Sequence, residues 1–133
     1  MDKVFAALVE EKASGPDKRL HWVAVFDDCL GVLPPRGSIV SFCTRYRHSR
    51  ISMIFTAQLF RGLPPTIRAN AGLYLLWGTT NAKELGKMED EFGGVFPDFL
   101  RIFTEATREP YHFLTLVMQR QLAAYADFGR RLA

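Results

Sequence analysis

The stretch from Leu20 to Leu30, which reads L-H-W-V-A-V-F-D-D-C-L, is the feature that most restricts the fold of this chain. A short run of Trp, Val, Ala and Phe is typical of a strand buried in a parallel sheet. Two carboxylates follow it directly, at Asp27 and Asp28. Open α/β sheets bind ligands at the carboxyl ends of their strands, so this pair favours a metal-nucleotide site. Asp also favours turns, and the pair is equally compatible with a strand that runs into a turn.

Composition limits the class of protein. The chain has 133 residues, 48% hydrophobic and 23% charged, which is typical of one soluble globular domain. The formal net charge of +3 is compatible with a nucleic-acid partner but does not require one. Cys29 and Cys43 have no Cys-His cluster around them, so we expect free thiols rather than a zinc site. The sequence shows no signal peptide and no apolar run near the roughly 20 residues of a membrane helix, which predicts a soluble, intracellular protein.

Strand-like and helix-like stretches alternate along the chain. This alternation predicts an α/β fold: a single domain with a mostly parallel sheet and flanking helices. We expect Ser38 and Asn81 to cap two of the helices. Five phenylalanines are expected in the core: Phe5, Phe42, Phe55, Phe99 and Phe103. The expected strands are 22–27, 51–56, 73–77 and 111–118, the expected helices are about 4–12, 39–48, 65–71, 82–92 and 97–107, and 119–133 is a basic tail compatible with one more helix.

The order of these pieces resembles a known family. After the Asp-Asp strand come T-R-Y-R-H, then I-S-M-I-F-T-A-Q, then L-P-P-T-I-R-A-N-A. This order resembles the C-terminal half of the virion DNA-packaging ATPases of large DNA viruses (poxvirus-type), which belong to the FtsK/HerA group of P-loop ATPases. The similarity covers Trp22 to Asn81, and continues more loosely over Glu105 to Leu114.

The resemblance implies a role for several side chains. Asp27 matches the Walker B aspartate, which binds the Mg²⁺ of Mg²⁺-ATP. Asp28 takes the place of the acid that polarises the attacking water, and Gln58 matches the polar sensor after the next strand. Such groups suit phosphoryl transfer, which requires mainly positioning and charge stabilisation. Two arginines are candidates for a finger that acts across a subunit boundary, with Arg68 first and Arg47 second, although a solvated charge is the alternative for each.

One part of the family pattern is missing. No G-x-x-x-x-G-K-[ST] phosphate loop occurs in the 133 residues. In the family this loop lies upstream, next to a central strand. We therefore expect a partial P-loop NTPase core without the P-loop strand, and no appreciable ATP hydrolysis unless a Walker A segment is supplied from elsewhere. Loss of that strand exposes two sheet edges, at 51–56 and 73–77, so we expect a rearranged strand order, a second chain in the gap, or low stability.

The resemblance also implies partners. The full-length protein would be a homo-oligomeric ring that couples ATP hydrolysis to movement of double-stranded DNA into the capsid. It would contact capsid or portal components in the host cytoplasm (virus factory) or the virion. Two alternatives stay open. One is a non-catalytic assembly or DNA-binding module derived from such an ATPase. The other is an unrelated small α/β domain whose Asp27 and Asp28 bind a metal for different phosphate chemistry.

Overall fold

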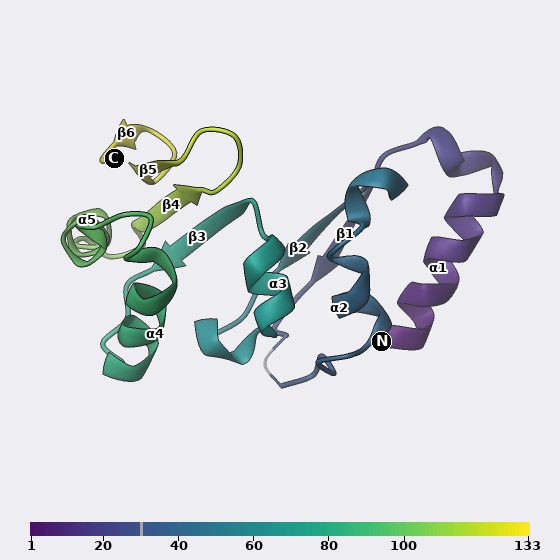
Figure 1. Cartoon of the computed structure of the whole chain (residues 1–133), viewed down its shortest axis with the longest axis horizontal. Coiled ribbons are helices and arrows are strands. Elements are labelled where there is room, and N and C mark those ends of the chain that lie inside the picture. The colour runs from purple at the N-terminus through teal and green to yellow at the C-terminus, as the bar shows by residue number, and fades with distance from the viewer. Residues whose placement is uncertain (30) are drawn as a thin grey trace. The chain divides into compact units, whose positions relative to one another are not determined.

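The computed structural model describes residues 1–29 and 31–133, without the side chain of residue 17. The chain divides into two compact units, Met1–Asn70 and Ala71–Ala133. Figure 1 shows the elements of both units, which are described separately below.

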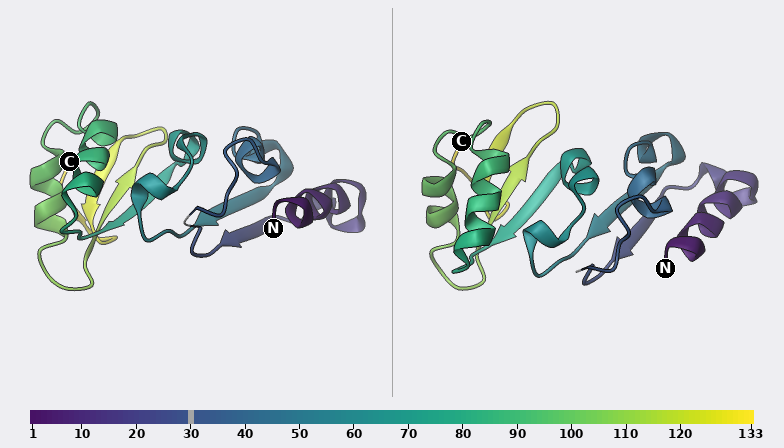
Figure 2. Two further views of the ribbon diagram at one scale, coloured as in Figure 1. Left: turned by 90° about the horizontal axis from the view of Figure 1, so that it is seen from below. Right: turned by 60° about the horizontal axis from the view of Figure 1, so that its bottom comes forward.

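The first unit is built on a two-stranded parallel sheet. Strand β1 is Trp22–Phe26 and strand β2 is Ile51–Phe55, and they pair from Trp22 beside Ile51 to Phe26 beside Phe55. Three views show the two strands side by side along their length (Figures 1 and 2). Strands therefore lie where the sequence predicts them, each one residue shorter than expected, and their parallel pairing agrees with the expected parallel sheet for this unit.

Three α-helices and three 3₁₀ turns accompany this sheet among the described residues of the first unit. They are α1 (Asp2–Ser14), η1 (Pro16–Arg19), α2 (Ser38–Phe42), η2 (Tyr46–Ser49), η3 (Phe60–Gly62) and α3 (Pro65–Asn70). The helix expected over 39–48 is too long: α2 ends at Phe42, and Arg50 after η2 adopts the left-handed conformation. One face of the sheet packs into a core of ten buried residues: Phe5, Phe26, Cys29, Leu33, Ile39, Val40, Phe42, Cys43, Ile51 and Ile67.

The cap of α2 differs from the expected one. Ser38 is the first residue of the helix rather than its N-cap, and Gly37 at the N-cap has no side chain to donate or accept. The carboxylate of Asp2 on α1 accepts the backbone N–H groups of Ser38 and Ile39, each at 2.8 Å. Two N–H groups of the first turn, which have no partner within α2, are thus satisfied by another helix.

The second unit contains an antiparallel sheet. Its strand order is β3 (Leu73–Trp77), β4 (Phe113–Val117), β5 (Ala123–Ala126) and β6 (Arg130–Arg131), and every pair is antiparallel. The expectation of a mostly parallel sheet is therefore wrong for this half of the chain. The basic tail, whose sequence is also compatible with a helix, forms β5 and β6 instead. Residues 118–122 are too few for the crossover that a parallel connection needs.

Helices α4 (Ala82–Phe92) and α5 (Phe99–Ala106) belong to this second unit. Asn81 caps α4 as expected, since its side-chain oxygen accepts the N–H groups of Lys83 and Glu84 at 3.0 and 3.4 Å. Phe99 and Phe103 are buried, as are Phe5 and Phe42 in the first unit, whereas Phe55 is half-buried. None of the described helices combines the length and apolar character that a bilayer crossing requires.

Each sheet has an edge strand next to which the family resemblance places the P-loop strand. Among the described residues, β2 pairs only with β1, and β3 pairs only with β4. A rearranged strand order, the first of the three expected outcomes, stays a prediction. A second chain and low stability stay predictions.

The Asp2 cap predicts a pH-dependent contribution to stability. Hydrogen bonds from Ile39 and Ser38 lower the pKa of Asp2 below its ordinary value of 3.8. A lowered folded-state pKa stabilises the fold above the ordinary value, and this contribution is lost as the pH falls through the lowered pKa. We expect Asp2→Asn to reduce the free energy of unfolding by about 0.5–1 kcal/mol at neutral pH, the low range for an accessible cap.

Urea denaturation between pH 3 and pH 7, about the range in which carboxylates titrate, measures this effect. The difference between wild type and Asp2→Asn should shrink at the acid end. Glu10→Gln, an exposed substitution on the same helix, is the control and should change little. Equal loss of stability at every pH would contradict the assignment of the carboxylate charge to this cap.

Candidate functional site

Thr56, which directly follows β2, forms hydrogen bonds with both aspartates. Its backbone N–H donates to Phe26 O, and its carbonyl oxygen accepts Cys29 N–H, both at 2.9 Å. Its hydroxyl group donates to Asp27 Oδ1 at 2.5 Å and accepts Asp28 N–H at 2.9 Å. Thr56, one residue beyond β2, therefore fixes the turn that follows β1. It contacts both the backbone of that turn and the carboxylate of Asp27.

The turn leaves both carboxylates accessible. Asp28 has a φ of +50°, in the left-handed region that Asp tolerates better than most residues. Asp27 and Asp28 are both exposed. The two interpretations of the acid pair are thus compatible, because the aspartates form a turn and also stand at the carboxyl end of a parallel strand.

Gln58 follows the same edge of the sheet. Since β1 and β2 are parallel and in register, the residues after Phe26 and after Phe55 emerge at the same end. Gln58 is exposed and lies two residues beyond Thr56. The structure therefore brings Asp27, Asp28 and Gln58 to one edge. Sequence reasoning missed Thr56; the available signal was a hydroxyl residue that ends the strand paired with the Asp-Asp strand.

Arg47 lies at the other end of β2. It belongs to η2, which precedes the strand, and its exposed guanidinium sits 5.7 Å from the Tyr46 ring centre. The five residues of β2 separate the two ends by about 16 Å at 3.3 Å per residue. The structure does not bring Arg47 to the aspartates of its own chain.

Arg68 is held inside the first unit. It lies on α3, is only 7% exposed, and its guanidinium Nη1 donates to Leu63 O at 2.5 Å. The guanidinium also lies 5.3 Å from the ring centre of Phe60. These contacts join α3 to the preceding loop. A finger needs an accessible guanidinium, which Arg68 does not present in this conformation, so its role as a finger stays a prediction.

The pKa of the buried Cys29 thiol is affected by the charges of the two aspartates. Its side chain is 1% exposed, and Sγ lies 3.1 Å from Phe26 O. Burial raises the pKa of the Cys29 thiol, and the negative charges of Asp27 and then Asp28 raise it further. Both carboxylates are therefore close enough to act electrostatically on the next side chain of the turn. As expected, neither Cys29 nor Cys43 forms a disulfide.

The donor set at this edge fits Mg²⁺ bound together with phosphate. The side chains that meet there offer carboxylate and hydroxyl oxygens, which are the ligands of a hard cation. Among the described residues, no group of three or more His, Cys, Asp or Glu side chains could hold a metal alone. Mg²⁺ is commonly held by one or two carboxylates plus substrate phosphates and water, so the acid pair suits a metal that arrives with a nucleotide.

Comparison with known proteins places this arrangement in a fold class. No family model and no curated protein sequence matches the chain. Solved structures do match, and they are of a viral genome packaging NTPase. At 18% identity this similarity shows a shared fold.

The matching protein is the genome packaging NTPase B204 from Sulfolobus turreted icosahedral virus 2. Its complex with ATPγS matches with a TM-score of 0.65 and 18% identity, over 96% of this chain and 62% of that chain. Its complex with sulfate matches with a TM-score of 0.63 and 18% identity, over 98% of this chain and 65% of that chain. The chain thus spans less than two thirds of each neighbour's length. The expected likeness to viral packaging ATPases is confirmed at the level of the fold.

The Thr56 contacts predict a measurable stability effect. Thr56→Val keeps the shape of the side chain but removes the hydroxyl group that contacts Asp27 and Asp28. We expect a loss on the order of 1 kcal/mol in the free energy of unfolding. The variant lacks the two hydrogen bonds of the hydroxyl group, and their contribution is limited because solvent can reach them. Urea denaturation measures it. Thr56→Ser keeps the hydroxyl group and should retain most of the stability, and equal losses in both variants would argue against a role for the hydroxyl.

The electrostatic link to Cys29 predicts a shift in thiol reactivity. In a Cys43→Ser background, Asp27→Asn should lower the pKa of the Cys29 thiol, because one neighbouring negative charge is removed. The pKa should stay above its ordinary value of 9.0, since burial is the larger cause. The pH profile of alkylation by iodoacetamide measures the pKa. Asp90→Asn is the control, and an unchanged profile in Asp27→Asn would contradict the assigned proximity.

Proposed function

We propose that the chain forms the acidic part of an ATP site in a viral genome-packaging ATPase. The observation that carries the proposal is the turn of Asp27 and Asp28, which Thr56 anchors at the carboxyl end of two parallel strands. Gln58 follows at the same edge. The neighbour B204 shares the fold, and that protein binds ATPγS, which supports ATP as the nucleotide here.

Each side chain has a role in this proposal. Asp27, oriented by the Thr56 hydroxyl group, would hold Mg²⁺. Asp28 would accept the hydrogen bond of the attacking water and direct its lone pair at the γ-phosphate. Gln58 would donate from its amide to that phosphate or to the water. Mg²⁺, when bound with ATP, supplies charge neutralisation on the phosphate oxygens.

The site also needs a phosphate-binding loop, which we propose is contributed by another segment. The sequence contains no G-x-x-x-x-G-K-[ST]. Two features of the first unit support an additional strand and its covering helix. β2 has β1 as its one strand partner among the described residues. On the sheet face away from the core, Val23, Val25 and Ile54 are 59%, 61% and 49% exposed. Apolar side chains and a strand edge of this kind favour pairing with further chain.

The proposed working form is a homo-oligomeric ring around double-stranded DNA, in contact with capsid or portal components in the infected cell or virion. Of the two candidate fingers, Arg47 fits a neighbouring subunit better. Its guanidinium is exposed and lies far from the acids of its own chain, whereas Arg68 is held by Leu63 O and Phe60. A non-catalytic DNA-binding or assembly module is the second candidate, favoured by the absence of the phosphate-loop motif from the sequence.

A phosphate-release assay tests the ATPase proposal. The 133-residue chain alone should release no phosphate from Mg²⁺-ATP above background. Turnover of about 1 per second, which is ordinary for an enzyme, would contradict it. A fusion that places a G-x-x-x-x-G-K-[ST] segment before residue 1 should bind ATP and hydrolyse it.

In that fusion, Asp28→Asn should abolish hydrolysis and keep ATP binding, because the amide no longer activates water. Asp90→Asn, an exposed acid on α4, is the matched control and should leave turnover unchanged. ATP binding without hydrolysis in the unmutated fusion favours the non-catalytic module. Equal turnover with and without Asp28→Asn would overturn the assigned role.

A further inference from the structure

A second polar feature of the first unit lies at the opposite end of the strands from the aspartates. A cavity of about 270 Å³ opens between the last turn of α1, η1 and η2, where β2 begins. Four basic side chains line it: Lys12, Lys18, His48 and Arg50. Val9 and Ile51 add an apolar wall. Among the described lining residues none is acidic.

Lys12 is the unusual member of this group. Its side chain is only 3% exposed, although Lys is almost never fully buried unless it is paired. Its ammonium group lies 3.4 Å from Lys18 O and 5.6 Å from the centre of the Trp22 ring. No carboxylate in the described part of the chain forms an ion pair with it. A buried ammonium group with three donors and one long hydrogen bond is suited to an anionic partner.

Arg50, the residue that directly precedes β2, adds another positive charge at the same cavity. Arg50 has a φ of +53°, in the left-handed region, and its guanidinium Nη1 donates to Arg19 O at 2.9 Å. This bond joins Arg50, a lining residue of the cavity, to the end of η1, and Arg50 itself is exposed. Lys18 and His48 are exposed at the rim. The cavity is therefore lined by one buried cation, Lys12, and by exposed basic residues.

The positive charges at the cavity favour an anion, although the negative end of the α1 helix dipole lies beside it. The cavity adjoins the C-terminus of α1, which carries about half a negative charge from the helix dipole. Among the described lining residues, Lys12, Lys18 and Arg50 contribute a positive charge each, which exceeds this half charge several-fold. Water excluded from the Lys12 side strengthens the attraction, because a lower local dielectric screens charges less.

We propose that this cavity binds a phosphate group. Its volume lies just below the roughly 300–1,000 Å³ of pockets that enclose drug-sized ligands, so it suits a phosphate with part of an attached sugar. The phosphate comes either from a free anion or nucleotide, or from the backbone of a nucleic acid. This site is separate from the acid pair by the length of β2, and it does not depend on the ATPase proposal.

Fluorescence of Trp22 provides a direct readout, because the Lys12 ammonium lies over its ring. Trp77 is removed as Trp77→Phe so that Trp22 alone reports. Inorganic phosphate added to the full chain should change the emission in a saturable way. Lys18→Ala and Lys12→Met, which keeps the aliphatic length of the side chain, should each weaken this binding about tenfold, as expected for loss of one charge-assisted hydrogen bond.

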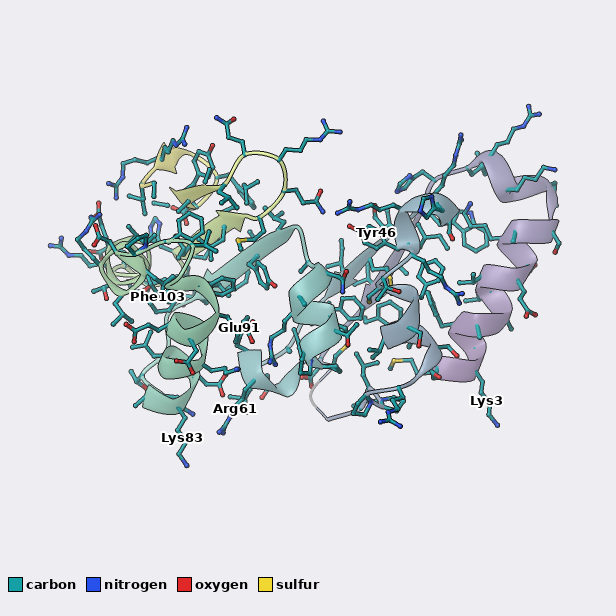
Figure 3. All side chains as sticks on the ribbon, viewed as in Figure 1. Lys3, Tyr46, Arg61, Lys83, Glu91 and Phe103 are labelled. Carbon is teal, nitrogen blue, oxygen red and sulfur yellow. The ribbon has the colours of Figure 1, made fainter. Side chains whose placement is uncertain are left out.

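Lys3→Ala is the matched control. Lys3 is exposed on the first turn of α1, at the end of that helix away from the cavity (Figure 3), and its removal changes net charge without touching the site. Its phosphate affinity should equal that of the unmutated chain. If Lys12→Met fails to fold by circular dichroism, Lys18→Ala at the exposed rim still decides the question.

A second experiment distinguishes a free anion from a nucleic-acid backbone as the source of the phosphate. Binding of a short DNA duplex is measured against salt for the same variants. If the backbone is the source, Lys18→Ala weakens duplex binding and lowers the salt slope by about 0.9, the value for one phosphate contact. Loss of inorganic-phosphate binding without any change in duplex binding assigns the site to a free anion. No saturable phosphate binding, or equal affinity in Lys18→Ala and Lys3→Ala, would overturn the proposal.

Discussion

Parallel, in-register pairing of β1 with β2 is the interaction on which both ends of the first unit depend. The pairing sets Phe26 beside Phe55, and their rings stack with centres 4.8 Å apart. Thr56 then comes level with the turn of Asp27 and Asp28. A shift of one residue would turn every side chain of a strand to the opposite face, so the core on one side holds the register firmly. The stacked rings thus support the Thr56 contacts, although they do not touch the carboxylates.

The two ends of this small sheet carry opposite charge. The carboxyl end has the acid pair and its hydroxyl anchor, and the amino end has a cavity lined by Lys12 and other basic groups. About 16 Å of strand lies between them, about twice the screening length of roughly 8 Å at physiological salt. Each end can therefore recognise its own ligand with little electrostatic interference from the other. The proposed ligands are a metal-bound nucleotide at the first end and a phosphate group at the second.

The first unit is also small for an α/β sheet. A two-stranded sheet is only marginally stable without packing partners. Here α1 and α2 supply them through the buried cluster around Phe5, Phe26 and Phe42, with ring centres 5.3 Å apart in both pairs that include Phe5. The carboxylate of Asp2 joins the two helices. The opposite face, with Val23 and Val25, lacks such a cover among the described residues, which is the physical basis for expecting further chain on that side.

Local sequence predicted the strands at 22–27, 51–56 and 73–77 and the position of the acid pair, because apolar runs and turn residues act on their immediate neighbours. Asn81 was predictable as a cap for the same reason. Tertiary structure alone decided the features that join distant residues. Asp2 caps a helix 36 residues away, and Thr56 reaches back 28 and 29 residues to Asp28 and Asp27. The basic cavity and the antiparallel second sheet arise in the same way, since a single sequence carries periodicity along the chain but not the pairing of segments across it.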